Sequence, residues 1–151
     1  VSLAISLHSP FDELRNKLVP LNKKYNIETL MASCRRFVKD KKKARITWEY
    51  TLIDGVNDQP EHARALTKLL SKIPSKINLI PFNPFPGTLF KQSKPENIER
   101  FKEICMKAGY ITTVRKTRGD DIAAACGQLA GEFMDRTRRS GQVNKLALEL
   151  V

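Results

Sequence analysis

One stretch of this 151-residue chain decides its fold: Arg45-Ile46-Thr47-Trp48-Glu49-Tyr50-Thr51-Leu52-Ile53-Asp54-Gly55, followed by Asp58-Gln59-Pro60-Glu61. Residues 45–53 predict a strand that stops at the Asp54-Gly55 turn. The tetrapeptide combines a capping residue, a first-turn proline and a capping-box glutamate, which predicts a helix through about Lys72. A further strand is expected from Ile77 to about Phe82. Strand, helix and strand in this order indicate a βαβ unit.

The same alternation extends toward the N-terminus. Residues 1–7 predict a first strand. Ser9 is expected to cap a short helix, with Pro10 in its first turn, that ends near Pro20. Residues 27–43 place apolar side chains three or four positions apart, which predicts one amphipathic helix.

The alternation also continues toward the C-terminus. Ser93-Lys94-Pro95-Glu96 predicts a helix that Gly109 can end in a left-handed conformation. An extended run follows over residues 110–116, and a last helix is expected after Gly119-Asp120-Asp121. Parallel neighbouring strands need a helical crossover, so the sequence predicts an α/β fold of parallel strands with flanking helices. Residues 1–151 form a single segment with no internal linker.

Composition excludes several classes of protein. Twenty-seven Lys and Arg against sixteen Asp and Glu give a net charge of +11, and 41% of the residues are hydrophobic, too many for a disordered basic tail. No apolar run is long enough for a membrane span, and the N-terminal residues lack the features of a signal peptide, so a cytoplasmic protein is expected. Three widely spaced cysteines without a C-x-x-C pair predict neither a disulfide framework nor a zinc site.

Ligands of parallel α/β folds collect beyond the carboxyl ends of the strands, which directs attention to two segments. Ser6-Leu7-His8 ends the first strand with a hydroxyl and an imidazole. His8 is interpreted either as a ligand-binding residue or as a partly buried histidine that the backbone satisfies. Asn83 follows the third strand between two prolines, where it could bind a ligand or form an Asx turn.

A third segment surrounds Cys126 with alanine and glycine, so little side-chain bulk covers its thiol. Nearby Arg115, Lys116 and Arg118 would favour the thiolate, whereas a buried, inert cysteine is the ordinary alternative. Cys34 and Cys105 lie on apolar helical stripes and are predicted to be core residues. The basic residues concentrate at three places, 35–45, 115–118 and 136–139, a pattern that favours nucleic acid over a membrane surface as the partner.

Several motifs, in this order along the chain, closely resemble one family, the radical S-adenosylmethionine RNA methyltransferases of the RlmN type. They are Ser6-Leu7-His8-Ser9-Pro10, the Arg35-Arg36 pair after Cys34, Glu49-Tyr50 with Asp54-Gly55-Val56-Asn57-Asp58, Asn78-Leu79-Ile80-Pro81-Phe82-Asn83-Pro84, and Thr117-Arg118-Gly119-Asp120-Asp121-Ile122 with Ala125-Cys126-Gly127-Gln128-Leu129. The resemblance covers essentially all 151 residues. It implies a six-unit partial (β/α) barrel, of which this chain is the C-terminal half.

The resemblance also implies an activity and its residues. Members of the family methylate carbon 2 of an adenine in 23S rRNA and in certain tRNAs. Ser6, Leu7, His8 and Asn83 match residues that bind S-adenosylmethionine. Cys126 matches the catalytic cysteine, which is methylated first and then loses hydrogen to a deoxyadenosyl radical that a 4Fe–4S cluster generates from a second cofactor molecule. The resulting methylene radical adds to the adenine ring, a difficult step that the cofactor supplies.

The cluster ligands are not in this chain, because the family's C-x3-C-x2-C triplet has no counterpart in it. The resemblance therefore implies that the chain is inactive without the N-terminal half of the enzyme. The other partners that it implies are an electron donor for the cluster and the RNA substrates. The complete enzyme is expected to be a monomer. Two alternatives stay open. One is a Cfr-type enzyme that methylates carbon 8 of the same nucleotide, and the other is a non-catalytic, basic RNA-binding α/β fragment.

Overall fold

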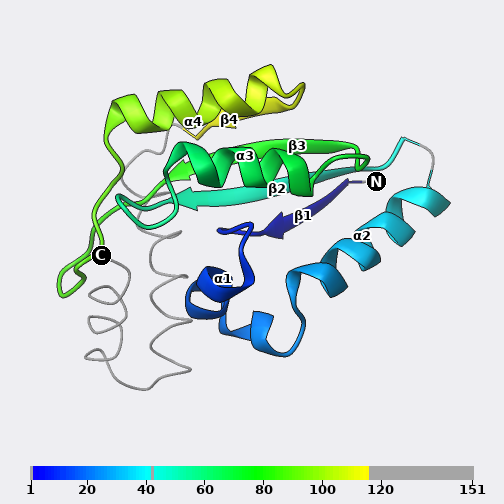
Figure 1. The fold of residues 1–151 in the computed structure, drawn as a ribbon, viewed down its shortest axis with the longest axis horizontal. Helices are drawn as coiled ribbons and strands as arrows, with labels where there is room; N and C mark the ends of the chain where they lie inside the picture. The colour runs from blue at the N-terminus through cyan, green and yellow to red at the C-terminus, as the bar shows by residue number, and fades with distance from the viewer. Residues whose placement is uncertain (1, 42, 116–151) are drawn as a thin grey trace.

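A computed structural model describes residues 2–41 and 43–115 of the chain (Figure 1). Its centre is a parallel sheet of four strands: β1 (Ser2–Ser6), β2 (Arg45–Leu52), β3 (Ser75–Pro81) and β4 (Ile111–Val114). The strands lie in sequence order, β1-β2-β3-β4. Ser6 pairs with Glu49, Glu49 with Asn78, and Asn78 with Thr113, so one row of residues runs straight across the sheet.

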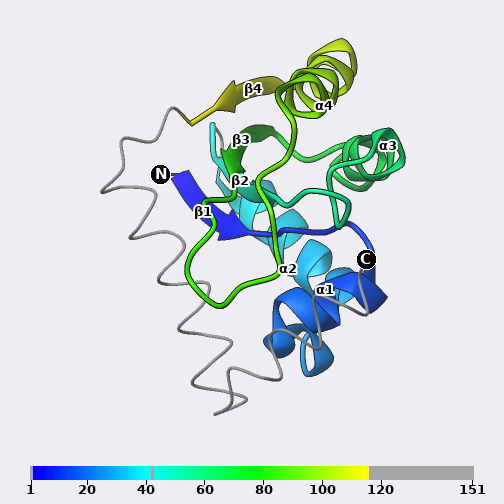
Figure 2. The same cartoon turned by 90° about the vertical axis from the view of Figure 1, so that its left-hand side faces the viewer.

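Helices fill each connection between the strands. The segment from β1 to β2 contains α1 (Asp12–Leu18), the 3-10 helix η1 (Pro20–Lys23) and α2 (Ile27–Asp40); α3 (Pro60–Leu69) joins β2 to β3, and α4 (Pro95–Lys107) joins β3 to β4. Figure 2 shows these helices on the same side of the strands. Sequential parallel strands joined by right-handed crossovers place their helices on one face, as in a (β/α) barrel. The predicted α/β class is confirmed.

Alternation along β2 separates the two faces of the sheet. Ile46, Trp48, Tyr50 and Leu52 are fully buried against the helices, whereas Thr47, Glu49 and Thr51 between them are only half-buried on the other face. Because successive side chains of a strand point to opposite faces, the helix-covered face holds the core and the other face carries polar side chains. Tyr50 also packs against Phe101 of α4, with ring centroids 5.0 Å apart.

The structure corrects where several elements begin. Ser9 does not cap α1: its Oγ accepts the backbone N–H of Phe11 at 3.0 Å, a local turn, and Phe11 precedes the helix. The cap of α3 is not formed by Asp58 and Glu61; instead the Gln59 N–H donates to Nδ1 of His62 at 3.1 Å. Ser93 does not cap α4, because Lys94 takes that position and the Ser93 hydroxyl is buried without a hydrogen bond within the described residues.

The predicted ends of the elements were closer to the structure, with small differences. The helix predicted over 27–43 stops at Asp40, and the helix predicted through about Lys72 stops at Leu69. Gly109 ends α4 as predicted, with φ +98°; the Tyr110 N–H donates to the Cys105 carbonyl and the Gly109 N–H to the Met106 carbonyl. This is a Schellman motif. Within the described residues, no helix combines the length and the apolar character that a transmembrane span requires. The last helix predicted by sequence lies outside them.

Candidate functional site

The predicted binding residues that the structure describes gather at the carboxyl end of the sheet. Ser6 is the last residue of β1 and is exposed; His8 follows two positions later. Asn83 follows β3 and is half-buried, and Arg115 follows β4, where its N–H donates to the Leu79 carbonyl at 2.8 Å. The residues that follow β1, β3 and β4 therefore lie at one end of the sheet, where parallel sheets bind their ligands.

Leu7 differs from its two neighbours. Its side chain is fully buried in the core, its N–H donates to the Glu49 carbonyl at 2.9 Å, and its carbonyl accepts from Nε of Arg15 at 2.9 Å. The side chain is therefore committed to packing and the backbone to internal hydrogen bonds. Its part in cofactor binding stays a prediction.

His8 is held in an unusual conformation at the mouth of the site. Its φ is +62°, in the left-handed region that residues other than glycine seldom adopt. Nδ1 accepts the Thr51 N–H at 3.0 Å, which ties the end of β1 to the end of β2. Burial, with a smaller effect of the Arg15 charge, lowers the pKa of His8 from 6.5 to about 4. At neutral pH the ring is therefore uncharged, with its proton on Nε2.

Asn57, which residue patterns alone do not single out, is the centre of this arrangement. It is fully buried, and its Nδ2 donates to the His8 carbonyl at 2.8 Å and to the Thr51 carbonyl at 2.7 Å. Its Oδ1 accepts the Ile53 N–H at 2.8 Å, and its own carbonyl accepts the Tyr50 hydroxyl at 2.7 Å. The only sequence signal for it is its place in the Asp54–Asp58 segment, which is one of the motifs that carry the family resemblance.

Arg15 is the second residue that sequence reasoning missed. It comes from α1 and is 7% exposed. Its Nε donates to the Leu7 carbonyl. Its two terminal nitrogens donate to Asn22 Oδ1 at 2.7 Å and to the Ser6 carbonyl at 3.2 Å. Burial lowers the pKa of Arg15, and the Asp12 charge opposes that shift. The sequence alone does not distinguish a buried arginine on an amphipathic helix from an arginine that faces solvent.

The face of the sheet away from the helices continues the polar surface. Glu49, Asn78 and Thr113 follow Ser6 across the four strands, in register, and the Thr113 hydroxyl lies 3.3 Å from Asn78 Oδ1. These side chains place donors and acceptors on this face, with Glu49 and Asn78 each three residues before the end of its strand.

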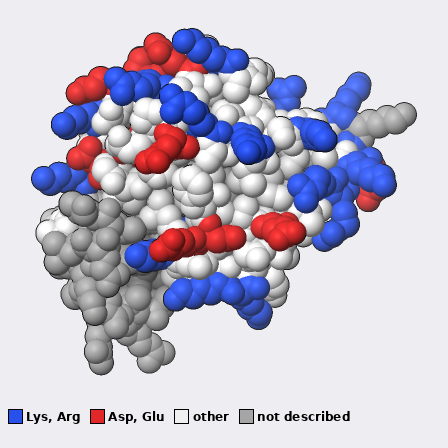
Figure 3. All heavy atoms as spheres, in the orientation of Figure 1, with Lys and Arg blue, Asp and Glu red and all other residues white. Residues whose placement is uncertain are grey.

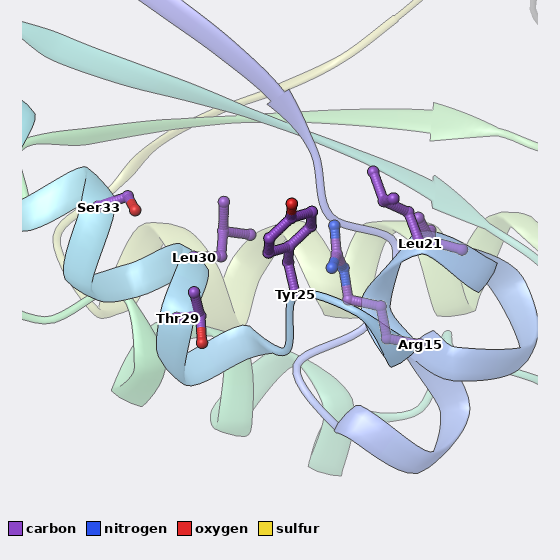
Figure 4. A pocket seen from close by; sticks show the side chains of 7 residues that line it. Arg15, Leu21, Tyr25, Thr29, Leu30 and Ser33 are labelled. Carbon is purple, nitrogen blue, oxygen red and sulfur yellow. The ribbon is translucent and has the colours of Figure 1, made fainter.

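A separate pocket of about 280 Å³ lies between α1, η1 and α2 (Figure 4). Its lining is Arg15, Val19, Leu21, Tyr25, Thr29, Leu30 and Ser33. In Figure 4 the Arg15 side chain extends from α1 toward the end of β1, with the Tyr25 ring beside it. None of the predicted site residues lines this pocket. It lies among α1, η1 and α2, so this pocket is not the predicted site.

The described cysteines do not form a metal centre. Cys34 in α2 and Cys105 in α4 are buried core residues, as predicted, and burial raises the pKa of the Cys105 thiol to about 12. Among the described residues, no three His, Cys, Asp or Glu side chains are placed to hold a metal ion. A 4Fe–4S cluster therefore does not fit this part of the chain. Cys126, Lys116 and Arg118 lie outside the described residues.

Positive charge is spread widely over the surface, with one concentration far from the site. In Figure 3 basic side chains gather over the turn between α2 and β2, on the right of the view. Residues 35–45 supply exposed cations there, including Lys39, Lys41 and Lys43. This turn precedes β2, so it lies at the amino end of the sheet, opposite His8. Arg115 is at the carboxyl end.

Comparison with known proteins identifies relatives over nearly the whole chain. No family model matches it. The chain is 62% identical over 143 residues to the dual-specificity RNA methyltransferase RlmN of Marinobacter nauticus; the alignment covers 93% of this chain and 38% of that protein.

Solved structures agree with the sequence comparison. A radical SAM methyltransferase from Sphaerobacter thermophilus superposes with a TM-score of 0.79 at 50% identity, covering 85% of this chain and 37% of the other. A domain of pyruvate-formate lyase-activating enzyme from Bacteroides vulgatus, 16% identical with a TM-score of 0.61, covers 76% of this chain and 66% of that domain and shares the fold alone. The chain is similar in sequence and in fold to RlmN-type radical SAM methyltransferases, and it spans 38% of the length of the RlmN relative that it matches.

Proposed function

We propose that this chain is the C-terminal part of an adenine-C2 methyltransferase that acts on 23S rRNA and tRNA. The observation that carries the proposal is the convergence of Ser6, His8 and Asn83 at the carboxyl end of one parallel sheet, in a chain 62% identical to an RlmN protein. The 38% coverage of that relative supports a larger polypeptide, of which residues 1–151 form one segment.

In this proposal S-adenosylmethionine, when bound, supplies the methyl group. Ser6 offers a hydroxyl and His8 an Nε2–H donor, and Asn83 offers an amide that can both donate and accept. The polar row through Glu49 widens the surface that such a ligand meets. These groups bind and orient; Cys126 is the residue proposed to carry the reacting sulfur, and Arg115, Lys116 and Arg118 are proposed to contact RNA phosphates.

The remaining parts of the proposed enzyme come from outside the described residues. The cluster ligands are assigned to the N-terminal half, because the described part of the chain holds no suitable group. In this proposal an external electron donor reduces that cluster. The complete enzyme is proposed to be cytoplasmic, since its RNA substrates occur in that compartment, and to be a monomer.

Substitution of the proposed catalytic thiol tests the function. In the complete polypeptide that carries this chain, Cys126→Ala should abolish adenine methylation of 23S rRNA fragments and tRNA. Cys34→Ala is the matched control, because Cys34 is buried in α2 away from the strand ends and should leave product formation intact. Retained methylation by Cys126→Ala contradicts the assignment.

The position of the methyl group distinguishes an adenine-C2 methyltransferase from an adenine-C8 methyltransferase. Digestion of the product RNA to nucleosides, followed by chromatography against 2-methyladenosine and 8-methyladenosine standards, identifies the carbon that is modified. Carbon 2 supports the RlmN-type proposal, and carbon 8 supports a Cfr-type enzyme.

A non-catalytic RNA-binding fragment is the second candidate, favoured by the net charge of +11 and by the exposed cations of residues 35–45. It predicts RNA affinity that falls steeply with salt and no response to S-adenosylmethionine. A rise in the unfolding temperature with S-adenosylmethionine counts against this candidate, because only a ligand that binds the folded state stabilises it.

A further inference from the structure

Three successive backbone carbonyls at the end of β1 are each bound by a buried side chain. Arg15 donates to the Ser6 carbonyl at 3.2 Å and to the Leu7 carbonyl at 2.9 Å. Asn57 donates to the next one, that of His8, at 2.8 Å. The two donors come from different parts of the fold, Arg15 from α1 and Asn57 from the loop after β2. We call this pair, Arg15 and Asn57, the carbonyl clamp.

The clamp acts where the sheet no longer fixes the backbone. Pairing of β1 with β2 ends with the Leu7 N–H on the Glu49 carbonyl, and the next residue, His8, adopts φ +62°. A residue other than glycine in this region costs about 1–3 kcal/mol and persists only where its surroundings over-determine it. Here Asn57 holds the His8 carbonyl and the Thr51 N–H holds the ring. The ring is thereby fixed with Nε2–H as its remaining donor.

Each nitrogen of the Arg15 guanidinium makes a hydrogen bond within the protein. Its Nε and both terminal nitrogens already donate to Leu7, Asn22 and Ser6. Asn57 is occupied in the same way, because both hydrogens of Nδ2 and the Oδ1 acceptor are used. Asn57 therefore has no donor left for a ligand, and three of the five N–H donors of Arg15 are committed to Ser6, Leu7 and Asn22. The hydrogen bonds of both residues act on the segment Ser6–His8.

We propose that Arg15 and Asn57 are positioning residues that set the conformation of Ser6–His8, and thereby aim the Ser6 hydroxyl and the His8 Nε2–H at one bound cofactor. This inference rests on the proposed binding of S-adenosylmethionine at the carboxyl end of the sheet. It adds two residues that contact no cofactor and that residue patterns did not identify.

Two substitutions remove the clamp while keeping side-chain size. Asn57→Asp keeps an acceptor for the Ile53 N–H but turns an oxygen toward the carbonyls of His8 and Thr51. Arg15→Lys replaces three directed donors by one ammonium, which cannot reach all of the present acceptors. Both variants, made in the complete polypeptide, should raise the dissociation constant of S-adenosylmethionine by about tenfold or more. Isothermal titration calorimetry measures it.

Ser75→Ala is the matched structural control. The Ser75 hydroxyl accepts the buried Trp48 indole N–H at 3.0 Å, at the start of β3 and so at the amino end of the same sheet. Its loss leaves a buried donor unpaired, which lowers the free energy of unfolding without touching Ser6–His8. If the clamp is merely structural, cofactor affinity of the folded protein will be equal in Ser75→Ala and in the clamp variants.

A histidine readout keeps the inference testable apart from the proposed function. In the ¹⁵N NMR spectrum, the His8 signal is identified by its loss in His8→Asn. The wild-type ring should show the neutral Nε2–H form with a titration midpoint near 4. In Asn57→Ala, which removes the clamp donor without adding a charge, the midpoint should rise toward 6.5, and in Ser75→Ala it should not move.

The outcomes separate the two claims. Weak cofactor binding by both clamp variants, with normal binding by Ser75→Ala, supports the inference; equal binding by all of them overturns it. If the wild-type polypeptide does not bind S-adenosylmethionine, the proposed function fails. The clamp is then judged by the His8 midpoint, and a midpoint that the uncharged variant Asn57→Ala leaves unchanged overturns it.

Discussion

Nδ1 of His8 accepts the backbone N–H of Thr51 at 3.0 Å, although the two residues are 43 positions apart in the sequence. This one hydrogen bond joins the ends of two parallel strands and selects the tautomer of the ring. An imidazolium could not accept the bond, because both of its nitrogens carry hydrogen. Protonation of His8 therefore opposes the native arrangement of this end of the sheet.

Acid should destabilise the protein through its two histidines. His62 repeats the pattern, with Nδ1 accepting the Gln59 N–H, and burial lowers its pKa too. Because the unfolded chain binds these protons first, stability is full above about pH 6.5 and declines as the pH falls toward 4. The part due to His8 amounts to about 3 kcal/mol at most.

Urea unfolding at pH 7 and at pH 4.5 measures this decline. His8→Asn is the suitable variant, since asparagine tolerates the left-handed backbone but lacks the ring. It should reduce the stability lost between the two pH values, and His62→Gln should reduce it further. An unchanged decline in the double variant would show that other groups cause it.

Alkylation should distinguish the three cysteines of the chain. Cys34 and Cys105 are 2% and 0% exposed, and burial raises the pKa of both thiols. A buried thiol of raised pKa forms little thiolate, so both should resist iodoacetamide at pH 7.5 in the native protein. Mass spectrometry of peptides should locate native-state labelling in this chain on Cys126. Labelling in denaturant, where all three react, is the control, and rapid native labelling of Cys105 would contradict the buried core.

RNA binding should depend on charge at the carboxyl end rather than the amino end of the sheet. Arg115→Gln should weaken RNA affinity and reduce the slope of log affinity against log salt by about 0.7 to 0.9. The triple variant Lys39→Gln, Lys41→Gln and Lys43→Gln removes cations from the opposite end and should have the smaller effect. Filter binding over a salt series measures both. The reverse order of effects would favour the non-catalytic RNA-binding fragment.

Gly109→Ala should destabilise α4. Gly109 has φ +98° and closes the Schellman motif, and a Cβ there meets no atom within 4 Å. The loss of about 1–2 kcal/mol therefore comes from backbone strain alone. Denaturant unfolding measures it, with Ala108→Gly, at the right-handed position before it, as the control. A stabilised Gly109→Ala variant would show that the positive φ is not maintained in solution.

Local patterns were sufficient for the elements but not for their caps. The strand and helix segments follow from periodicity and punctuation, which depend on neighbours within a few residues. Gly109 was predictable for the same reason. Ser9, Asp58 and Ser93 were each expected to cap a helix and none does so in the structure, because several polar residues compete for each cap and the path of the entering chain decides among them.

By itself, the sequence determined the parallel α/β fold, the buried cysteines of α2 and α4, and the strand ends at which Ser6, His8 and Asn83 lie. These depend on hydrophobic period and on the rule that the ends of parallel strands share an edge. Only the tertiary structure decided how that edge is held. The bonds of Asn57 and Arg15 to the Ser6–His8 backbone join positions up to 49 apart in the sequence. Every residue has a main-chain carbonyl, so the sequence does not indicate which carbonyl a distant side chain will bind.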